Sequence, residues 1–97
     1  NMLTYKAMYK FSADGVHGEV LDFPGVLTCG KDLNEARELL AGALVDMAET
    51  NLRLGESLPS PDSALSDAAA DIEEPIHLIL NASSRVRIVP ELTYEAA

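Results

Sequence analysis

The segment from Asp22 to Ala36, DFPGVLTCGKDLNEA, constrains the fold more than any other part of the chain. Pro24-Gly25 predicts a turn, because proline has no amide hydrogen to donate to a strand and glycine allows a positive φ. Gly30 predicts a second bend a few residues later. The segment therefore separates a strand-forming region from a helix-forming region, and it contains no catalytic constellation.

A single long helix is predicted from Asp32 to Leu54, with Gly55 just beyond its end. Asp32 can cap this helix by accepting from the amide of Glu35, and Glu35 can reach back to complete a capping box. Helical spacing places one set of side chains toward a sheet: Leu33, Ala36, Leu40, Ala43, Leu44, Met47 and Leu54.

The apolar stripe of the predicted helix is wider than one sheet contact needs. Leu39, Ala41, Val45 and Ala48 broaden it, which suits a second contact surface such as another subunit. Gly42 lies in mid-helix, where glycine costs about 1 kcal/mol relative to alanine. We therefore expect another backbone to approach the helix closely at Gly42.

The region before the helix predicts three strands. Residues 3–11 alternate with period two and are rich in aromatic side chains, as is typical of a half-buried strand. Asp14-Gly15 is a strong hairpin signal, and residues 16–23 follow as the second strand. Residues 26–29 are a short third strand, ended by Gly30.

The C-terminal third predicts one short helix and two strands. A rigid, extended linking segment is predicted at Leu58-Pro59-Ser60-Pro61. The acidic, alanine-rich residues 62–71 predict a short helix, which Glu73-Glu74-Pro75 ends. The elements that follow are a strand at 76–80, a turn at 81–84 and a strand at 86–89.

The predicted fold class is α+β. A small antiparallel sheet, with the element order β-β-β-α-β, packs on one long helix, and a short C-terminal helix and strand extend it. The 97 residues allow one small domain, which we place at residues 2–97 with a core at 3–61 and an extension at 62–97. A chain this short buries a modest core, so a homo-oligomer is expected.

The chain is strongly acidic, with a net charge of −9 from 16 acidic and 7 basic side chains. This charge opposes direct nucleic-acid binding, whose affinity depends on neutralised phosphates. It favours a basic protein partner through electrostatic steering, or it only keeps the chain soluble. The single cysteine excludes an intramolecular disulfide. With no signal sequence and no stretch long enough to span a bilayer, the chain is predicted to be cytoplasmic.

No catalytic residue, cofactor or metal site is predicted. Cys29 would need a base beside it to act as a nucleophile, and His17 and His77 are distant in the sequence. A small, partly buried structural cysteine is the favoured interpretation, and a hydrolase using Cys29 or the Asp22 region is the least favoured function. Turn and cap roles explain the carboxylates that would otherwise suggest a divalent metal site: Asp14, Asp22, Glu35 and Glu38.

The opening hairpin and the spacing that follows it resemble the HicB-like antitoxin family. The shared features are an aspartate, an apolar residue and Pro-Gly, then a glycine, an acidic helix cap and Glu-Ala. A proline motif follows the helix, here Pro59-Ser60-Pro61. The resemblance covers Leu3 to about Pro61. It assigns structural roles to the motif positions Asp22, Pro24, Gly25, Gly30, Asp32, Glu35 and Ala36.

The resemblance implies a truncated RNase H-like fold without its nuclease carboxylates. It also implies a non-enzymatic antitoxin that covers a small, basic, HicA-like mRNA-cleaving toxin within a multimer. The alternative is a solitary homo-oligomeric structural or regulatory domain with a different protein or small-molecule partner.

The chain departs from the family pattern in two places. Val26 follows Pro-Gly where the family often has cysteine. After Pro75 only two short strands and a tail are predicted, whereas many family members carry a DNA-binding helix pair there. Direct DNA binding is therefore not expected.

Overall fold

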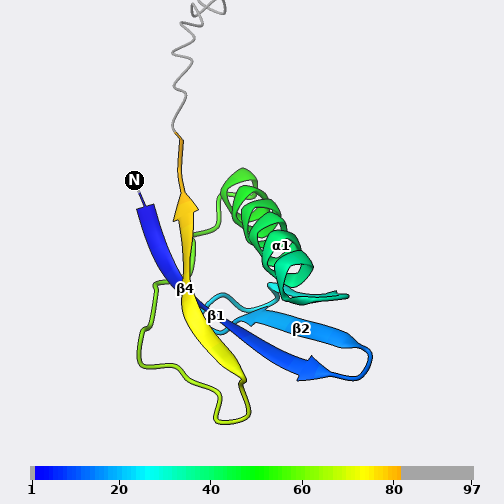
Figure 1. Ribbon diagram of the computed structural model, residues 1–97. Helices are drawn as coiled ribbons and strands as arrows, with labels where there is room; N and C mark the ends of the chain where they lie inside the picture. Colours follow the sequence, from blue (N-terminus) through cyan, green and yellow to red (C-terminus); the bar gives the residue numbers. More distant parts are fainter. Residues whose placement is uncertain (1, 82–97) are drawn as a thin grey trace, which may run out of the picture.

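The computed structural model describes residues 2–81 as a four-stranded antiparallel sheet with one long helix across one of its faces (Figure 1). The strand order in the sheet is β3-β2-β1-β4. The α+β class and the predicted order of the main elements are thereby confirmed. The elements are β1 (Met2–Ser12), β2 (Gly15–Val20), β3 (Leu27–Gly30), α1 (Leu33–Arg53) and β4 (Ile72–Ile79).

β1 is the central strand, and its alternation decides which side of the sheet is the core. Tyr5, Ala7 and Tyr9 are buried beneath α1, as their period-two spacing predicts. Phe11 shares their face but lies half exposed near the end of the strand. We call the opposite face of the sheet the second face. On β1 it carries Lys6, Met8 and Lys10.

β2 is shorter than the sequence predicts, because the chain leaves the sheet at Val20. The amide of Val20 donates to the Val26 carbonyl over 2.9 Å, and the amide of Phe23 donates back to Val20 over 3.2 Å. Pairing between β2 and β3 resumes at Leu27, opposite Glu19. The aromatic ring of Phe23 turns into the core, where it packs edge-on against Tyr5 at 5.3 Å.

α1 buries one stripe against the sheet and leaves the rest of its surface open. The buried positions are Ala36, Leu40, Leu44 and Ala48. Leu54, which was predicted to face the sheet, is 67% exposed because it is already the C-terminal cap. Gly55 follows with a φ of +74°, a conformation that glycine accepts without strain.

The expectation of a close backbone approach at Gly42 is wrong. A Cβ atom built at Gly42 has no neighbour within 4 Å among the described residues. The reason is its position on the helix: Gly42 is two residues from both Leu40 and Leu44, so it points away from the sheet.

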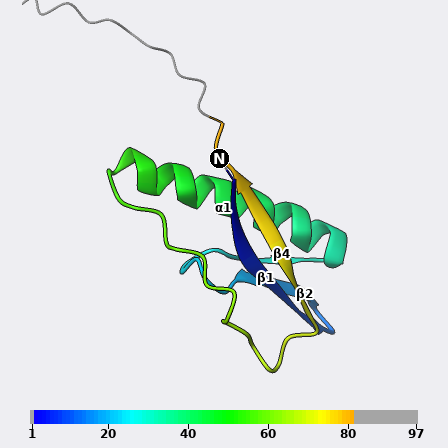
Figure 2. The ribbon, with the colours of Figure 1, turned by 90° about the vertical axis from the view of Figure 1, so that its left-hand side faces the viewer.

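The short helix predicted at 62–71 is not formed. The chain crosses the sheet there as an irregular segment, which we call the connector (residues 55–71); it leaves the end of α1 and returns to the start of β4 (Figure 2). Asp62 accepts from the amide of Ala64 over 3.0 Å, and Asp67 accepts from the amide of Ala69 over 2.9 Å. Such side-chain turns compete with helical hydrogen bonds, and this outweighs the helix propensity of the alanines.

β4 begins at Ile72, earlier than predicted, and contains Pro75, which was wrongly predicted to end a helix. Pro75 lies opposite Lys6. The amide and the carbonyl of Lys6 both point toward the β2 side, to Asp22 Oδ1 and the Leu21 amide. The nitrogen of Pro75 therefore faces the outer edge of the sheet, where no ladder bond is lost. The predicted turn at 81–84 and strand at 86–89 lie outside the described residues, apart from Asn81.

Candidate functional site

The predicted motif residues fall into two groups, and the first is the junction of β3 with α1. Gly30 approaches the helix so closely that an added Cβ would lie 2.6 Å from the amide nitrogen of Ala36 and 2.9 Å from its Cα. Ala36 is completely buried. Only a residue without a side chain at Gly30, facing a small one at Ala36, lets the strand run directly into the helix.

The helix start beside this junction is capped as predicted. Asp32 Oδ1 accepts from the amide of Glu35 over 2.8 Å. Glu35 Oε1 accepts from the amide of Lys31 over 3.0 Å, one residue before the cap. The Asp32 half of the predicted capping box is thus present, whereas Glu35 reaches the amide before the cap residue rather than that of Asp32 itself. Both carboxylates suit the positive helix end and have partners within the fold.

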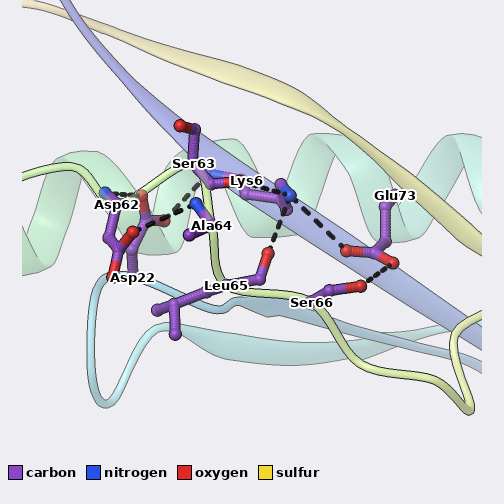
Figure 3. Close-up of polar contacts among 8 residues, drawn as sticks. All are labelled: Lys6, Asp22, Asp62, Ser63, Ala64, Leu65, Ser66 and Glu73. Atoms are coloured by element: carbon purple, nitrogen blue, oxygen red, sulfur yellow. Dashed lines mark hydrogen bonds and ion pairs between the residues drawn. The ribbon is translucent and has the colours of Figure 1, made fainter.

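The second group is the turn at residues 22–25, where Asp22 is the key side chain. It is only 4% exposed. Its Oδ1 accepts from the amide of Lys6 over 2.8 Å, and its Oδ2 accepts from the amide of Asp62 over 2.9 Å (Figure 3). One carboxylate thus joins the central strand, the turn and the connector. A charged acceptor makes each of these bonds stronger than its neutral equivalent.

The remaining turn residues shape the chain around Asp22. Pro24 is exposed. Gly25 has a φ of +90°, and a Cβ there would lie 3.3 Å from the Met47 methyl group. The structure therefore places Gly25 beside Met47 of α1, apart from the Gly30–Ala36 junction at the helix start.

Tyr5 connects the core to the connector from the helix side of the sheet. Its hydroxyl donates to the carbonyl of Pro59 over 2.7 Å. Burial raises the pKa of the Tyr5 hydroxyl, and the nearby charge of Asp22 raises it further. Burial also raises the pKa of Tyr9, an effect that Glu74 reinforces and Arg37 opposes.

We expect these two tyrosines to make the protein sensitive to alkali. Because the folded state favours the neutral phenol, their contribution to stability is complete below the unfolded pKa of about 10 and is lost as the pH rises through the folded pKa. Urea unfolding should therefore have a lower midpoint at about pH 11 than at about pH 8. Tyr5→Phe should cost about 1 kcal/mol at the lower pH, by leaving the Pro59 carbonyl without its donor.

Lysines titrate in the same pH range, so the Tyr5→Phe protein is also the control. Between about pH 8 and about pH 11, the free energy of unfolding should fall less in the Tyr5→Phe protein than in the unchanged protein. Equal losses in both proteins would assign the alkaline effect to the lysines and contradict the role given to Tyr5.

Two lysines of the second face hold the connector, a role that the sequence analysis did not identify. Lys6 Nζ donates to the carbonyls of Ser63 and Leu65 over 2.9 and 2.7 Å and lies 3.8 Å from Glu73 (Figure 3). Lys10 Nζ lies 2.8 Å from Asp67. This hydrogen bond raises the pKa of Lys10 and lowers that of Asp67. The sequence signal that could have found this contact is Asp67, which is followed by small residues that favour a side-chain turn over a helix.

A cavity of about 340 Å³ lies between β1, β4 and the connector. Lys6, Asp22, Ser66 and Glu73 are among the residues that line it. Each of these polar side chains already has a partner: Ser66 donates to Glu73 over 2.8 Å, and Lys6 and Asp22 make the bonds given above. The charged groups Lys6, Asp22 and Glu73 of the cavity are therefore engaged within the fold.

The residues considered for catalysis are placed differently from what the sequence suggests. Cys29 is exposed rather than partly buried, because it lies on the second face of edge strand β3. His17, although distant in sequence, is its cross-strand partner. His17 lies 3.6 Å from Glu19, and His77 is hydrogen-bonded to Thr4 at 3.0 Å. Within residues 2–81, no three histidine, cysteine or acidic side chains are grouped to hold a metal ion.

Membrane insertion by a helix is not indicated by the described part of the chain. α1 is the long helix there, and it is neither apolar nor uncharged enough to cross a bilayer.

The sheet, the single helix and the strand after the connector together define the fold of a HicB N-terminal domain. The crystal structure of the N-terminal domain of the Burkholderia pseudomallei antitoxin HicB matches with a TM-score of 0.66 and 20% identity, over 80% of this chain and 100% of that chain. The crystal structure of the Burkholderia pseudomallei antitoxin HicB matches with a TM-score of 0.65 and 17% identity, over 97% and 80% of the two chains.

A third similar structure is a HicA3 and HicB3 toxin–antitoxin complex, with a TM-score of 0.54 and 22% identity over 61% of this chain and 69% of that chain. A search of curated proteins finds no match. A family model does match: the chain belongs to the UPF0150-like family, over residues 4–59. The resemblance to HicB-like domains seen in the sequence is thereby confirmed.

Proposed function

We propose that this chain is an antitoxin that neutralises a small basic, RNA-cleaving toxin by covering its active site. The observation that carries the proposal is the fold match, which spans the whole N-terminal domain of a HicB antitoxin. A similar fold is also present in a solved complex of a toxin with its antitoxin. The net charge of −9 supports a basic partner, because opposite charges speed the encounter and favour the correct pairing.

The polar groups of the fold support binding rather than catalysis. The motif positions serve the turn, the helix cap and the strand–helix junction: Asp22 binds backbone amides, and Asp32 and Glu35 accept backbone amides at the start of α1. We therefore propose no enzymatic activity of its own, and we propose that residues 2–97 act as one domain in the cytoplasm, in a homo-oligomer. Direct DNA binding remains unexpected.

The test is reconstitution with the product of a small basic reading frame next to this gene. We expect the two proteins to co-purify and light scattering to show a defined complex. The basic protein alone should cleave RNA, and this cleavage should stop when the acidic chain is added in equal amount. Light scattering of the acidic chain alone gives its oligomeric state.

A matched control separates inhibition from charge neutralisation. An unrelated acidic protein of similar size and charge should leave RNA cleavage unchanged. If the two chains form no complex, or if the control inhibits equally well, the antitoxin function is rejected in favour of a solitary regulatory domain.

A further inference from the structure

α1 has a continuous solvent-facing surface, which we call the outer face of α1. At about 100° per residue it centres on Gly42, directly opposite the buried stripe. No described element lies on this side of the helix in Figure 1. The outer face consists of Glu38, Leu39, Gly42, Val45, Asp46, Glu49, Leu52 and one cation, Arg53.

The outer face exposes large apolar side chains that the fold itself does not use. Leu39, Val45 and Leu52 are 45%, 44% and 52% exposed. Val45 and Leu52 are seven residues apart and lie on one flank of the outer face, and Leu39 lies on the other flank. The carboxylates lie between these flanks, and large exposed apolar side chains beside polar ones are a feature of surfaces that bind other proteins.

The charges of the outer face are also unused. Within residues 2–81, Glu38, Asp46 and Glu49 form no ion pair, and Arg53 is the basic residue in the last turn. On the second face, by contrast, both lysines already bind the connector. The outer face therefore offers three unpaired carboxylates of the described chain to a partner.

Gly42 provides an independent indication. It costs α1 about 1 kcal/mol relative to alanine, and nothing within the described chain requires the absence of a side chain there. A bare position at the centre of an exposed helix face lets a second surface approach the helix backbone. A contact with another molecule there would offset the cost that glycine imposes on α1.

We propose that the outer face of α1 is the docking surface for the basic partner, an inference that rests on the proposed function. A second copy of this chain fits less well. Two such faces in contact would bring the carboxylates of Glu38, Asp46 and Glu49 against their equivalents with almost no cations between them, and like charges across an interface are costly. A partner with a basic, partly apolar surface would complement both the carboxylates and the apolar side chains of the outer face.

The experiment compares substitutions that reverse the same charge at two exposed sites. Asp46→Lys lies on the outer face, and Asp14→Lys lies in the β1–β2 turn; both residues are exposed. We expect Asp46→Lys to weaken binding of the toxin about tenfold or more and Asp14→Lys to leave it within about twofold. Gly42→Lys should also weaken binding while preserving the fold, because lysine is a better helix former than glycine.

Calorimetry with the toxin and thermal melting of each variant separate the possible outcomes. If the unchanged chain binds and all three variants bind equally well, the docking surface is overturned while the proposed function stands. If Gly42→Lys or Asp46→Lys abolishes self-association without affecting toxin binding, the face belongs to a second copy and the inference is again overturned.

A second arm covers the case in which no toxin binds and the proposed function fails. A helical peptide of leucine and lysine is titrated into the labelled protein, and backbone NMR shifts are followed. Shifts centred on the outer face of α1, and lost in Asp46→Lys, support it as a surface for basic partners. Shifts elsewhere, or none, overturn the inference.

Discussion

Gly30→Ala is expected to destabilise the protein strongly, because the new methyl group would meet the backbone of α1. The added Cβ would lie 2.6 Å from the backbone nitrogen of Ala36 and 2.9 Å from its Cα. Neither atom can move without shifting the first turn of α1, so the clash cannot be relieved by a side-chain rotation. We expect a loss of about 3 kcal/mol, at the upper end for overpacking. In a domain of this size, that lowers the melting temperature by more than about 10 °C.

Gly42→Ala is the matched control, because it makes the same chemical change at a site with open space. We expect it to stabilise the protein by about 1 kcal/mol, through helix propensity alone. Circular dichroism melts of the two variants should therefore move in opposite directions. Melts that move together would mean that the close contact between Gly30 and Ala36 does not control stability.

Asp22→Ala is expected to have the second largest effect. It removes the acceptor of two backbone amides, those of Lys6 and Asp62, at a site where the carboxylate is buried. An amide left without a partner costs about 1–3 kcal/mol, so the two together should cost about 3 kcal/mol. The connector should also detach, and hydrogen exchange at the Asp62 amide should speed up well before the sheet unfolds.

Two substitutions serve as controls for Asp22→Ala, one at another aspartate and one that keeps an acceptor at Asp22. Asp14→Ala removes an exposed carboxylate from a turn and should change stability by less than about 0.5 kcal/mol. Asp22→Asn keeps one acceptor oxygen and should fall between Asp14→Ala and Asp22→Ala. An unchanged melting point in Asp22→Ala, with slow exchange at Asp62, would show that water replaces the carboxylate.

Local signals in the sequence predicted the elements whose geometry is set by nearest neighbours. The alternation in residues 3–11, the hairpin at Asp14-Gly15 and the cap at Asp32 each depend on a few adjacent residues, and the structure contains all three. The role of Asp22 was only partly foreseen. A turn aspartate is easily recognised, but its bond to Asp62 joins residues 40 apart in the chain.

The failures share a physical cause, which is that tertiary contacts override local propensity. Residues 62–71 have the composition of a helix, yet Asp67 is drawn to Lys10 and Asp62 to the turn at Asp22. Pro75 suggests a break, yet it lies where the sheet needs no donor. Cys29 was expected inside because cysteine is usually buried, but its strand is short and lies at an edge.

The position of Pro75 also bears on how copies of this chain behave at high concentration. The outer edge of β4 offers amide donors at Glu73 and again at His77, with none at the proline between them. A strand arriving from a neighbouring molecule would lose its hydrogen-bond partner at that point, and an uninterrupted edge is what templated aggregation requires. Pro75 therefore interrupts the row of donors along this edge, and we expect it to disfavour the addition of a neighbouring strand.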